Sequence, residues 1–88
     1  MAVCEHLTAL GDAEPEPMTL DGCVGCLAEG RDDWVHLRLC LTCGNVGCCD
    51  SSPRRHASRH YAEVAHPVVR SFEAGENWRW CFVDEAVG

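Results

Sequence analysis

Hydrophobic and polar residues alternate in one stretch near the middle of the chain. Over residues 34–40, WVHLRLC, the apolar Val35, Leu37 and Leu39 are separated by polar side chains. A period of two places these apolar residues on one face, so the pattern predicts a half-buried strand over this stretch.

Two more short strands are predicted toward the C-terminus, over residues 68–72 (VVRSF) and 78–83 (WRWCFV). The segment between them, EAGEN, contains Gly75 and predicts a hairpin loop. Because side chains in a strand point alternately to its two faces, three aromatic residues of the second strand should share one face. These are Trp78, Trp80 and Phe82.

A helix is predicted for residues 54–65, RRHASRHYAEVA. Ser51 or Ser52 can cap its N-terminus, Pro53 fits its first turn, and the Pro that follows His66 ends it. Two histidines four positions apart should lie on one face of this helix. They are His56 and His60. Together with the strands, the helix predicts an α+β fold, a small antiparallel sheet with one main helix.

The length and the Cys content predict a small domain stapled by metal. A chain of 88 residues buries too small a share of its surface to be stabilised easily by a core alone, and its eight Cys and five His supply groups for crosslinks. The N-terminal residues have neither a basic region nor a long apolar run, so we expect no signal peptide, no membrane span and a reducing, cytoplasmic location. There, Cys pairs mixed with His favour zinc over disulfides.

The charge of the chain argues against binding to nucleic acid. Seven Arg and no Lys stand against fourteen acidic residues, giving a formal net charge of -7. Nucleic-acid affinity needs cations that neutralise phosphates, so neither nucleic acid nor an anionic membrane is an expected partner. The stretch from Cys40 to His60 has the spacing of a DNA-reading finger, but Gly47 and Pro53 stand where such a finger has large apolar residues.

The composition also carries a bias. Lys, Ile and Gln are all absent from the chain, which indicates a GC-rich, bacterial genome.

Two Cys-x2-Cys pairs followed by spaced His indicate structural zinc, since tetrahedral zinc takes four ligands with short paired spacings. In the first pair, Gly25 is expected to permit the tight backbone that turns two thiolates toward one ion. The candidate ligands are Cys4, His6, Cys23, Cys26, Cys40, Cys43, Cys48 or Cys49, His56, His60, His66, Cys81 and Asp84. Spacing alone leaves their grouping open. One possible grouping joins Cys40, Cys43, His56 and His60 and leaves Cys23, Cys26, Cys48 and His66 for another ion.

The succession of CEH, CVGC, WVHLRLCLTCGNVGCCDSSPRRHASRH, HP and WRWC resembles the ubiquitin-specific-protease type zinc finger, particularly its short stand-alone bacterial members. The resemblance runs from Cys4 to about Glu85 and implies that residues 1–88 form one domain of this type. It implies an interleaved grouping, with three zinc ions expected and at least two required. The implied sets are Cys23, Cys26, Cys48 and His56, then Cys40, Cys43, His60 and His66, then Cys4, His6, Cys81 and Asp84, where relatives have a final Cys in place of Asp84.

The resemblance also implies a binding cleft. Trp80 matches a family Trp that lines a pocket for the free Gly-Gly carboxyl end of ubiquitin, and Trp34 is a looser match to a second pocket aromatic. Phe82 shares the face of Trp80 and is a further candidate.

One residue of this cleft departs from the family. Ubiquitin-binding members have an Arg two positions after the ligand matched by Cys48, and this chain has Asp50 there. A carboxylate at that position repels the carboxylate of the ligand and removes a bidentate partner, so ubiquitin binding is not expected. Three arginines are candidates to take over that role. They are Arg54, Arg55 and Arg79.

These observations favour an interaction module over an enzyme, because closed tetrahedral zinc leaves no position for a substrate. The leading hypothesis is a monomeric, zinc-stabilised module that binds a peptide or protein tail in a Trp-lined cleft. The alternative is a thiol-based redox or zinc sensor, since oxidation at Cys48 and Cys49 would release metal. A hydrolase with an open third zinc site is the remaining possibility.

Overall fold

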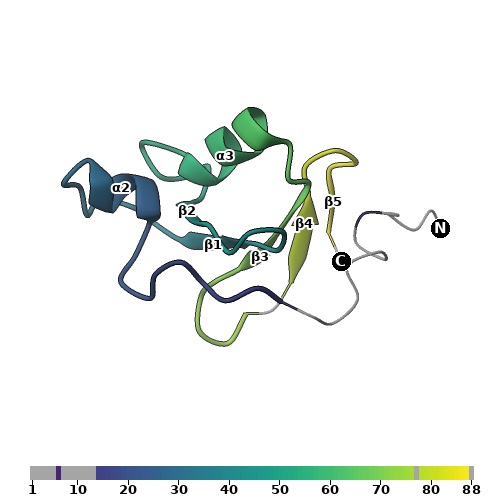
Figure 1. Cartoon of the computed structure of the whole chain (residues 1–88), viewed down its shortest axis with the longest axis horizontal. Coiled ribbons are helices and arrows are strands. Elements are labelled where there is room, and N and C mark those ends of the chain that lie inside the picture. Colours follow the sequence, from purple (N-terminus) through teal and green to yellow (C-terminus); the bar gives the residue numbers. More distant parts are fainter. Residues whose placement is uncertain (1–5, 7–13, 77, 88) are drawn as a thin grey trace.

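The computed structural model of the chain describes His6, residues 14–76 and residues 78–87. The described residues contain a five-stranded antiparallel sheet with the strand order β2-β1-β3-β4-β5, a main helix and a short helix that precedes the sheet (Figure 1). The predicted α+β class, with an antiparallel sheet and one main helix, is therefore confirmed. The elements are α2 (Val24–Ala28), β1 (Leu37–Cys40), β2 (Val46–Cys48), α3 (His56–Val64), β3 (Val68–Ser71), β4 (Arg79–Cys81) and β5 (Ala86–Val87).

One face of the sheet is covered by α3. The registers of β1 with β3 and of β3 with β4 place Arg38, Val69 and Trp80 on this face. Figure 1 shows α3 lying across it, with α2 beyond one end of the helix. A Cβ atom on Gly47 would lie 2.7 Å from the backbone nitrogen of Ala57, so α3 begins in direct contact with the backbone of β2.

The other face of the sheet carries the small apolar core. Its buried members include Leu39, Val46 and Val68, each at most 1% exposed. Residues 14–22 run along this side of the sheet, opposite α3 (Figure 1). The Glu14 carboxylate lies 3.0 Å from the guanidinium of Arg70, which ties this acidic segment to β3. This acidic segment is thus a strap over the core.

The main helix begins later than the sequence predicts. Its N-cap is Arg55, in the left-handed conformation with φ of 45°, and no side chain caps it. The prediction that Ser51 or Ser52 caps the helix is therefore wrong. Ser52 is buried, and its hydroxyl accepts a hydrogen bond of 2.8 Å from the backbone of Val35 instead. Ser52 also precedes the N-cap residue Arg55 by a full three positions, too far along the chain to cap α3.

The strands also differ from the sequence pattern. β1 begins only at Leu37, and Val35 is 51% exposed, so the alternation extends beyond the strand. The patterns did not indicate α2, β2 or β5. All three residues of β2 are buried, and a strand buried on both faces shows no alternation to detect. β5 has two residues, too few to carry a period.

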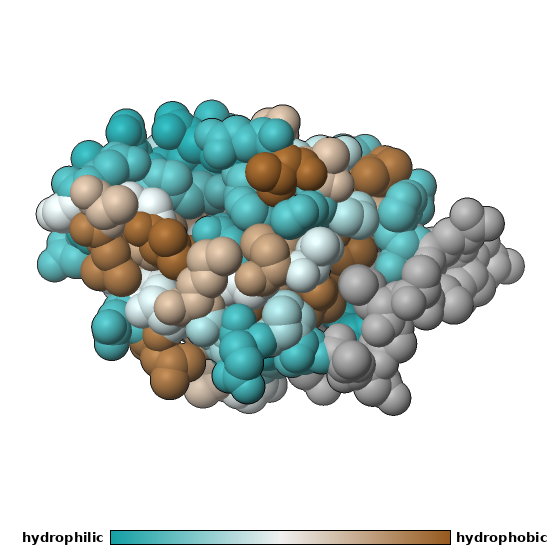
Figure 2. Space-filling view, viewed as in Figure 1, coloured by the Kyte–Doolittle hydropathy of each residue, from teal (hydrophilic) through white to brown (hydrophobic). Residues whose placement is uncertain are grey.

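The surface is largely hydrophilic along the outer side of α3, and hydrophobic residues are scattered elsewhere (Figure 2). The most exposed large apolar side chain in the described residues is Leu20, at 82%. No helix in the described part of the chain has the length and apolar character needed to cross a membrane.

Candidate functional site

The first cluster of candidate ligands joins separate segments of the chain. Cys23 is the N-cap of α2 and Cys26 lies within that helix. Cys48 ends β2 and His56 begins α3, so the contact between the helix and the sheet assembles the cluster. The first cluster is Cys23, Cys26, Cys48 and His56, whose ligand atoms all lie within 4.8 Å of one another.

The geometry of the first cluster fits tetrahedral zinc. With zinc bond lengths of about 2.3 Å to sulfur and about 2.0–2.1 Å to nitrogen, ligand atoms should lie about 3.6–3.8 Å apart. The Nδ1 atom of His56 lies 3.2, 3.3 and 3.6 Å from the sulfurs of Cys23, Cys26 and Cys48. The sulfurs of Cys26 and Cys48 are 3.9 Å apart. These four donor atoms surround a space of the size that a zinc ion needs.

The ionisation of the thiols in the first cluster also favours a bound cation. Burial, reinforced by the sulfurs of Cys23 and Cys48, raises the pKa of Cys26 to about 12. Burial likewise raises the pKa of Cys48, because a thiolate is disfavoured away from water and close to another sulfur. A bound dication reverses this, since metal coordination deprotonates thiols.

Gly25 has a different role from the predicted one. Its backbone is helical within α2, and a Cβ atom at this position would lie 2.5 Å from Cδ2 of His56. The absent side chain therefore makes room for the imidazole ring. The expectation of a special backbone at Gly25 is replaced by a requirement for close approach.

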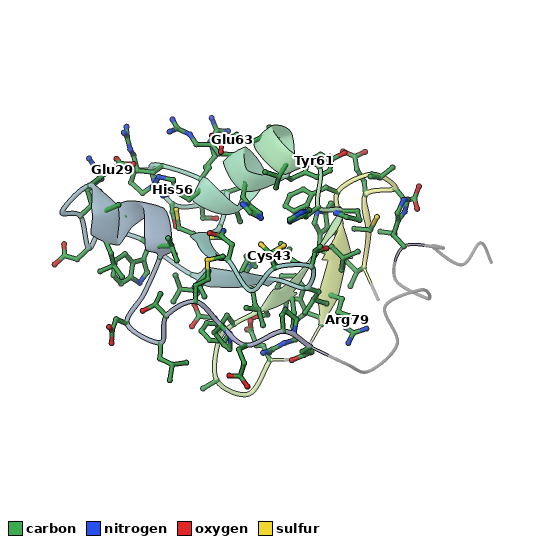
Figure 3. All side chains as sticks on the ribbon, in the orientation of Figure 1. Glu29, Cys43, His56, Tyr61, Glu63 and Arg79 are labelled. Atoms are coloured by element: carbon green, nitrogen blue, oxygen red, sulfur yellow. The ribbon has the colours of Figure 1, made fainter. Side chains whose placement is uncertain are left out.

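Two further residues hold His56 in place. The Nε2 atom of His56 lies 2.8 Å from a carboxylate oxygen of Glu29, the C-cap residue of α2. Arg54 donates to the other oxygen of Glu29 at 2.9 Å. Hydrogen bonds from His56 and then Arg54 hold the pKa of Glu29 below its usual range. A carboxylate that orients a ligand imidazole is the usual outer support of zinc sites, and Figure 3 shows Glu29 beside His56.

Replacing Glu29 by Gln should weaken zinc binding at the first cluster by about 10- to 100-fold, the usual effect of losing an outer-shell partner. The amide keeps the size of the side chain but loses the charge that orients the imidazole. Zinc affinity can be measured by competition with a chromophoric chelator. Asp32→Asn is the matched control, because Asp32 is exposed and belongs to none of the three clusters. Equal zinc affinity in both variants would contradict this role.

The second cluster lies under α3, beside the first. The Cys40 sulfur is 3.5 Å from Nδ1 of His66, and the Cys43 sulfur is 3.3 Å from Nε2 of His60. Burial, and then the neighbouring His66, lower the pKa of His60 and favour the neutral imidazole that binds metal. The second cluster is Cys40, Cys43, His60 and His66, with its ligand atoms within 4.8 Å of one another.

The third cluster is smaller and more open. Nδ1 of His6 lies 3.2 Å from a carboxylate oxygen of Asp84, and the Cys81 sulfur lies 4.0 Å from the same oxygen. The three ligand atoms fall within 4.8 Å, and their N, S and O donors are all acceptable to zinc. The fourth expected ligand, Cys4, is outside the described residues.

His56 and His60 serve different clusters although they are one helical turn apart. The structure thus brings the ligands together in the interleaved arrangement that the resemblance implies. The alternative grouping, which joins both histidines to Cys40 and Cys43, is not found among the clusters of the described residues. In Figure 3, His56 lies toward α2 and Cys43 lies below the middle of α3.

A cavity of about 560 Å³ lies between the start of α3 and the covered face of the sheet. Its wall includes Trp78, Trp80 and Phe82, the three residues predicted to share one face of a strand. Asp50 lines it as well and accepts a hydrogen bond from the Ser58 hydroxyl. We refer to this cavity as the aromatic cleft.

Arg38 is the cationic side chain of the aromatic cleft, and the sequence did not indicate this role. Its guanidinium carbon lies 4.6 Å from the centre of the Trp78 ring, a cation–π contact. None of the ion pairs within the described ranges involves Arg38. Its position between Leu37 and Leu39 indicated only that Arg38 lies on the opposite face of the strand from these two residues. The strand register was needed to place it on the same face as Trp80.

The arginines suggested by the sequence lie elsewhere. Arg54 pairs with Glu29, Arg79 lies 3.8 Å from a carboxylate oxygen of Glu14, and Arg55 is the N-cap of α3. In Figure 3, Arg79 is on the side of the sheet away from α3. None of the three is among the residues that line the aromatic cleft.

Trp34 also lies outside the lining of the aromatic cleft. It packs against Cys23, Cys26 and Cys48 of the first cluster, and its ring occupies the space beside Gly22. Its suggested role as a second cleft aromatic is replaced by one in packing around the first cluster. The match of Trp34 to a cleft aromatic rested on a loose spacing, and Trp78 lines the cleft where Trp34 does not.

Cys49 belongs to none of the three clusters. It is 7% exposed, lines the aromatic cleft and has its sulfur 3.6 Å from the Ser52 hydroxyl. Burial opposes ionisation of this thiol, but hydrogen bonds from Ser52 and from backbone amides outweigh it and lower the pKa of Cys49. Burial also limits the access that an oxidant would need.

Comparison with known proteins identifies the kind of domain. The sequence model of the family described as "Zn-finger in ubiquitin-hydrolases and other protein" matches residues 23–87. The chain is 30% identical over 69 residues to ubiquitin carboxyl-terminal hydrolase 14 of Schizosaccharomyces pombe, across 75% of this chain but only 9% of that protein's length. A solution NMR structure of protein RPA1320 from Rhodopseudomonas palustris is 45% identical, with a TM-score of 0.84, and the match covers 99% of this chain and 81% of that one.

Proposed function

This chain belongs to the family of zinc fingers found in ubiquitin hydrolases and other proteins, and we propose that it is a zinc-stabilised module that binds the C-terminal tail of a partner protein in the aromatic cleft. The observation that carries the proposal is the position of Arg38 against Trp78 inside that cleft. The zinc ions hold the fold together, and the cleft makes the contact.

The chemistry of the aromatic cleft supports a carboxylate ligand. A guanidinium presents several N–H donors in a planar fork that matches the two oxygens of a carboxylate. Stacking on Trp78, together with a hydrogen bond of 2.9 Å from one guanidinium nitrogen to the Leu37 carbonyl, holds the Arg38 side chain in place. No ion pair in the described residues involves Arg38. Trp80 and Phe82 provide an apolar wall that excludes water, which strengthens such a pairing.

Asp50 narrows the choice of tail. Its carboxylate lines the same cleft as Arg38, so the site combines one positive and one negative group. Asp50 repels a ligand carboxylate placed against it and favours a tail that brings a basic side chain or backbone donors to that side. For this reason the free end of ubiquitin is not the ligand that we expect.

Catalysis by the first two clusters has no place in the proposed function. Each cluster offers four protein ligands, and a zinc ion closed by four protein ligands has no position left for substrate or for reactive water. We therefore place the function of this chain in binding.

The test is a library of short peptides with a free C-terminal carboxylate, compared with the same peptides amidated, with the ubiquitin tail included. We expect binding only to free carboxylates, and most strongly to tails with a basic residue near the end. Loss of the ion pair through Arg38→Met should lower affinity about 10-fold or more, because hydrogen bonds to charged groups contribute about 1.5–3 kcal/mol. Trp80→Ala should abolish binding without loss of zinc.

Arg79→Met is the matched control, because this arginine lies outside the lining of the cleft. Its affinity for the same peptides should equal that of the parent protein. Equal binding of amidated and free peptides would rule out recognition through Arg38. Binding that survives Trp80→Ala would place the site elsewhere on the molecule.

A further inference from the structure

We propose that the third cluster is an exchangeable metal site whose occupancy sets the shape of the aromatic cleft, so that a divalent cation such as Zn²⁺ regulates the cleft. The inference rests on the proposed function only in treating the cleft as a binding site. It separates the third cluster from the other two, which we regard as permanent parts of the fold.

The three clusters differ in access to solvent. The cysteines of the first cluster are at most 1% exposed, and Cys40 of the second is 1% exposed. In the third cluster Cys81 is equally buried, but the side chains of His6 and Asp84 are 38% and 45% exposed, against 12% for the His56 side chain of the first cluster. A competing ligand or water must reach the ion before it can leave, so access favours exchange at the third cluster.

The donor atoms differ in the same direction. The described ligands of the third cluster are one sulfur, one nitrogen and one carboxylate oxygen, from Cys81, His6 and Asp84. Thiolates are the softer ligands and hold zinc more strongly than a carboxylate that also faces water. The first cluster has three sulfurs around its histidine, and none of its four ligands is a carboxylate. Its ion should therefore be lost last.

The third cluster is joined to the cleft through the turn between β4 and β5. Cys81 ends β4, and Asp84 lies in the turn that follows. Phe82 stands between these two ligands and lines the cleft. An ion bound to both ligands therefore restrains the backbone on each side of Phe82.

The neighbouring contacts carry this restraint into the rest of the cleft. The ring of Phe82 stacks on Tyr61 of α3, with centroids 4.9 Å apart. Trp80 immediately precedes Cys81 and pairs across the sheet with Val87 of β5, and both line the cleft. A change in the turn thus moves an aromatic wall and the edge strand together. With the ion bound the wall is held for a ligand, and without it the wall can relax.

The experiment follows metal and cleft at the same time, without any peptide. Zinc release to the chelator 4-(2-pyridylazo)resorcinol is recorded by absorbance, and the indole N–H signals are followed by ¹H–¹⁵N NMR. We expect one zinc per chain to leave at least about 10-fold faster than the rest, a difference of about 1.4 kcal/mol in the barrier to release. The Trp80 indole signal should shift with this first ion.

Trp34 provides an internal control, because it packs on the first cluster. Its indole signal should stay constant until the slower ions leave. Asp84→Ala should lose the fast ion while keeping the other zincs and the amide spectrum of α3. Asp84→Cys should keep the ion and slow its release, and Asp32→Ala should behave like the parent protein.

Three results would overturn the inference: release of all zinc in one phase, a fast phase that persists in Asp84→Ala, or a Trp80 signal that does not respond to the fast ion. Failure of the peptide library would leave these readouts unchanged, because no peptide is present. The inference and the proposed function can therefore fail separately.

Discussion

Chelation of zinc from the first and second clusters is expected to unfold the domain completely. Of the largest fully buried side chains only Leu39, Val46 and Val68 are aliphatic, and the others are mostly cluster cysteines. So small an apolar core cannot offset the entropy cost of ordering the chain. Structural zinc in small fingers contributes about 10–16 kcal/mol of binding free energy that is also folding free energy.

The measurement is circular dichroism during addition of a strong chelator, with zinc counted by native mass spectrometry. The helical signal of α3 should disappear as the last two ions leave, and it should return when zinc is added in excess. Chelator already saturated with zinc is the control and should change nothing. A metal-free protein that keeps its helical signal and a cooperative thermal transition would contradict this prediction.

Gly47→Ala is expected to destabilise the domain strongly, although it adds a single methyl group. The new Cβ would lie 2.7 Å and 2.8 Å from the backbone nitrogen and Cα of Ala57. These are backbone atoms at the start of α3, so the helix must move as a body. That movement withdraws His56 from the first cluster and His60 from the second. We expect a loss of at least about 3 kcal/mol in the free energy of unfolding, at the upper end for overpacking.

Thermal or urea unfolding with zinc present measures this loss, and zinc affinity should fall with it. Gly75→Asn is the control, since a Cβ at Gly75 would meet nothing within 4 Å and Asn tolerates its positive φ of 82°. The control should unfold close to the parent protein. A Gly47→Ala variant with parental stability and zinc content would show that α3 is not held against β2 as described.

The fold class and the family followed from the sequence, but several elements did not. The alternating stretch around Leu37 and Leu39 identified β1, and the aromatic face of Trp78 and Trp80 was predicted correctly. The helix was found but its start was not, because Ser52 is used by the loop before β1. β2 is buried throughout and carries no alternation, so its pattern has no signal.

By itself, the sequence determined the chemistry of this protein. The paired cysteines and spaced histidines indicate a zinc site, because these donors at these spacings suit a tetrahedral ion. The fourteen acidic residues against seven Arg led us to expect no nucleic-acid partner, because net charge follows from composition alone. Neither conclusion depends on which residues come together.

Only the tertiary structure decided the grouping of the ligands and the charges of the cleft. His56 and His60 lie one helical turn apart, so local spacing allows them one ion or two, and the contact of α3 with Gly47 assigns them to two. Arg38 reaches Trp78 because of the strand register, and Asp50 joins them from the loop that precedes α3. Such contacts join segments that are distant in the sequence. Their energies depend on how those segments pack together, which the pattern of neighbouring residues does not reveal.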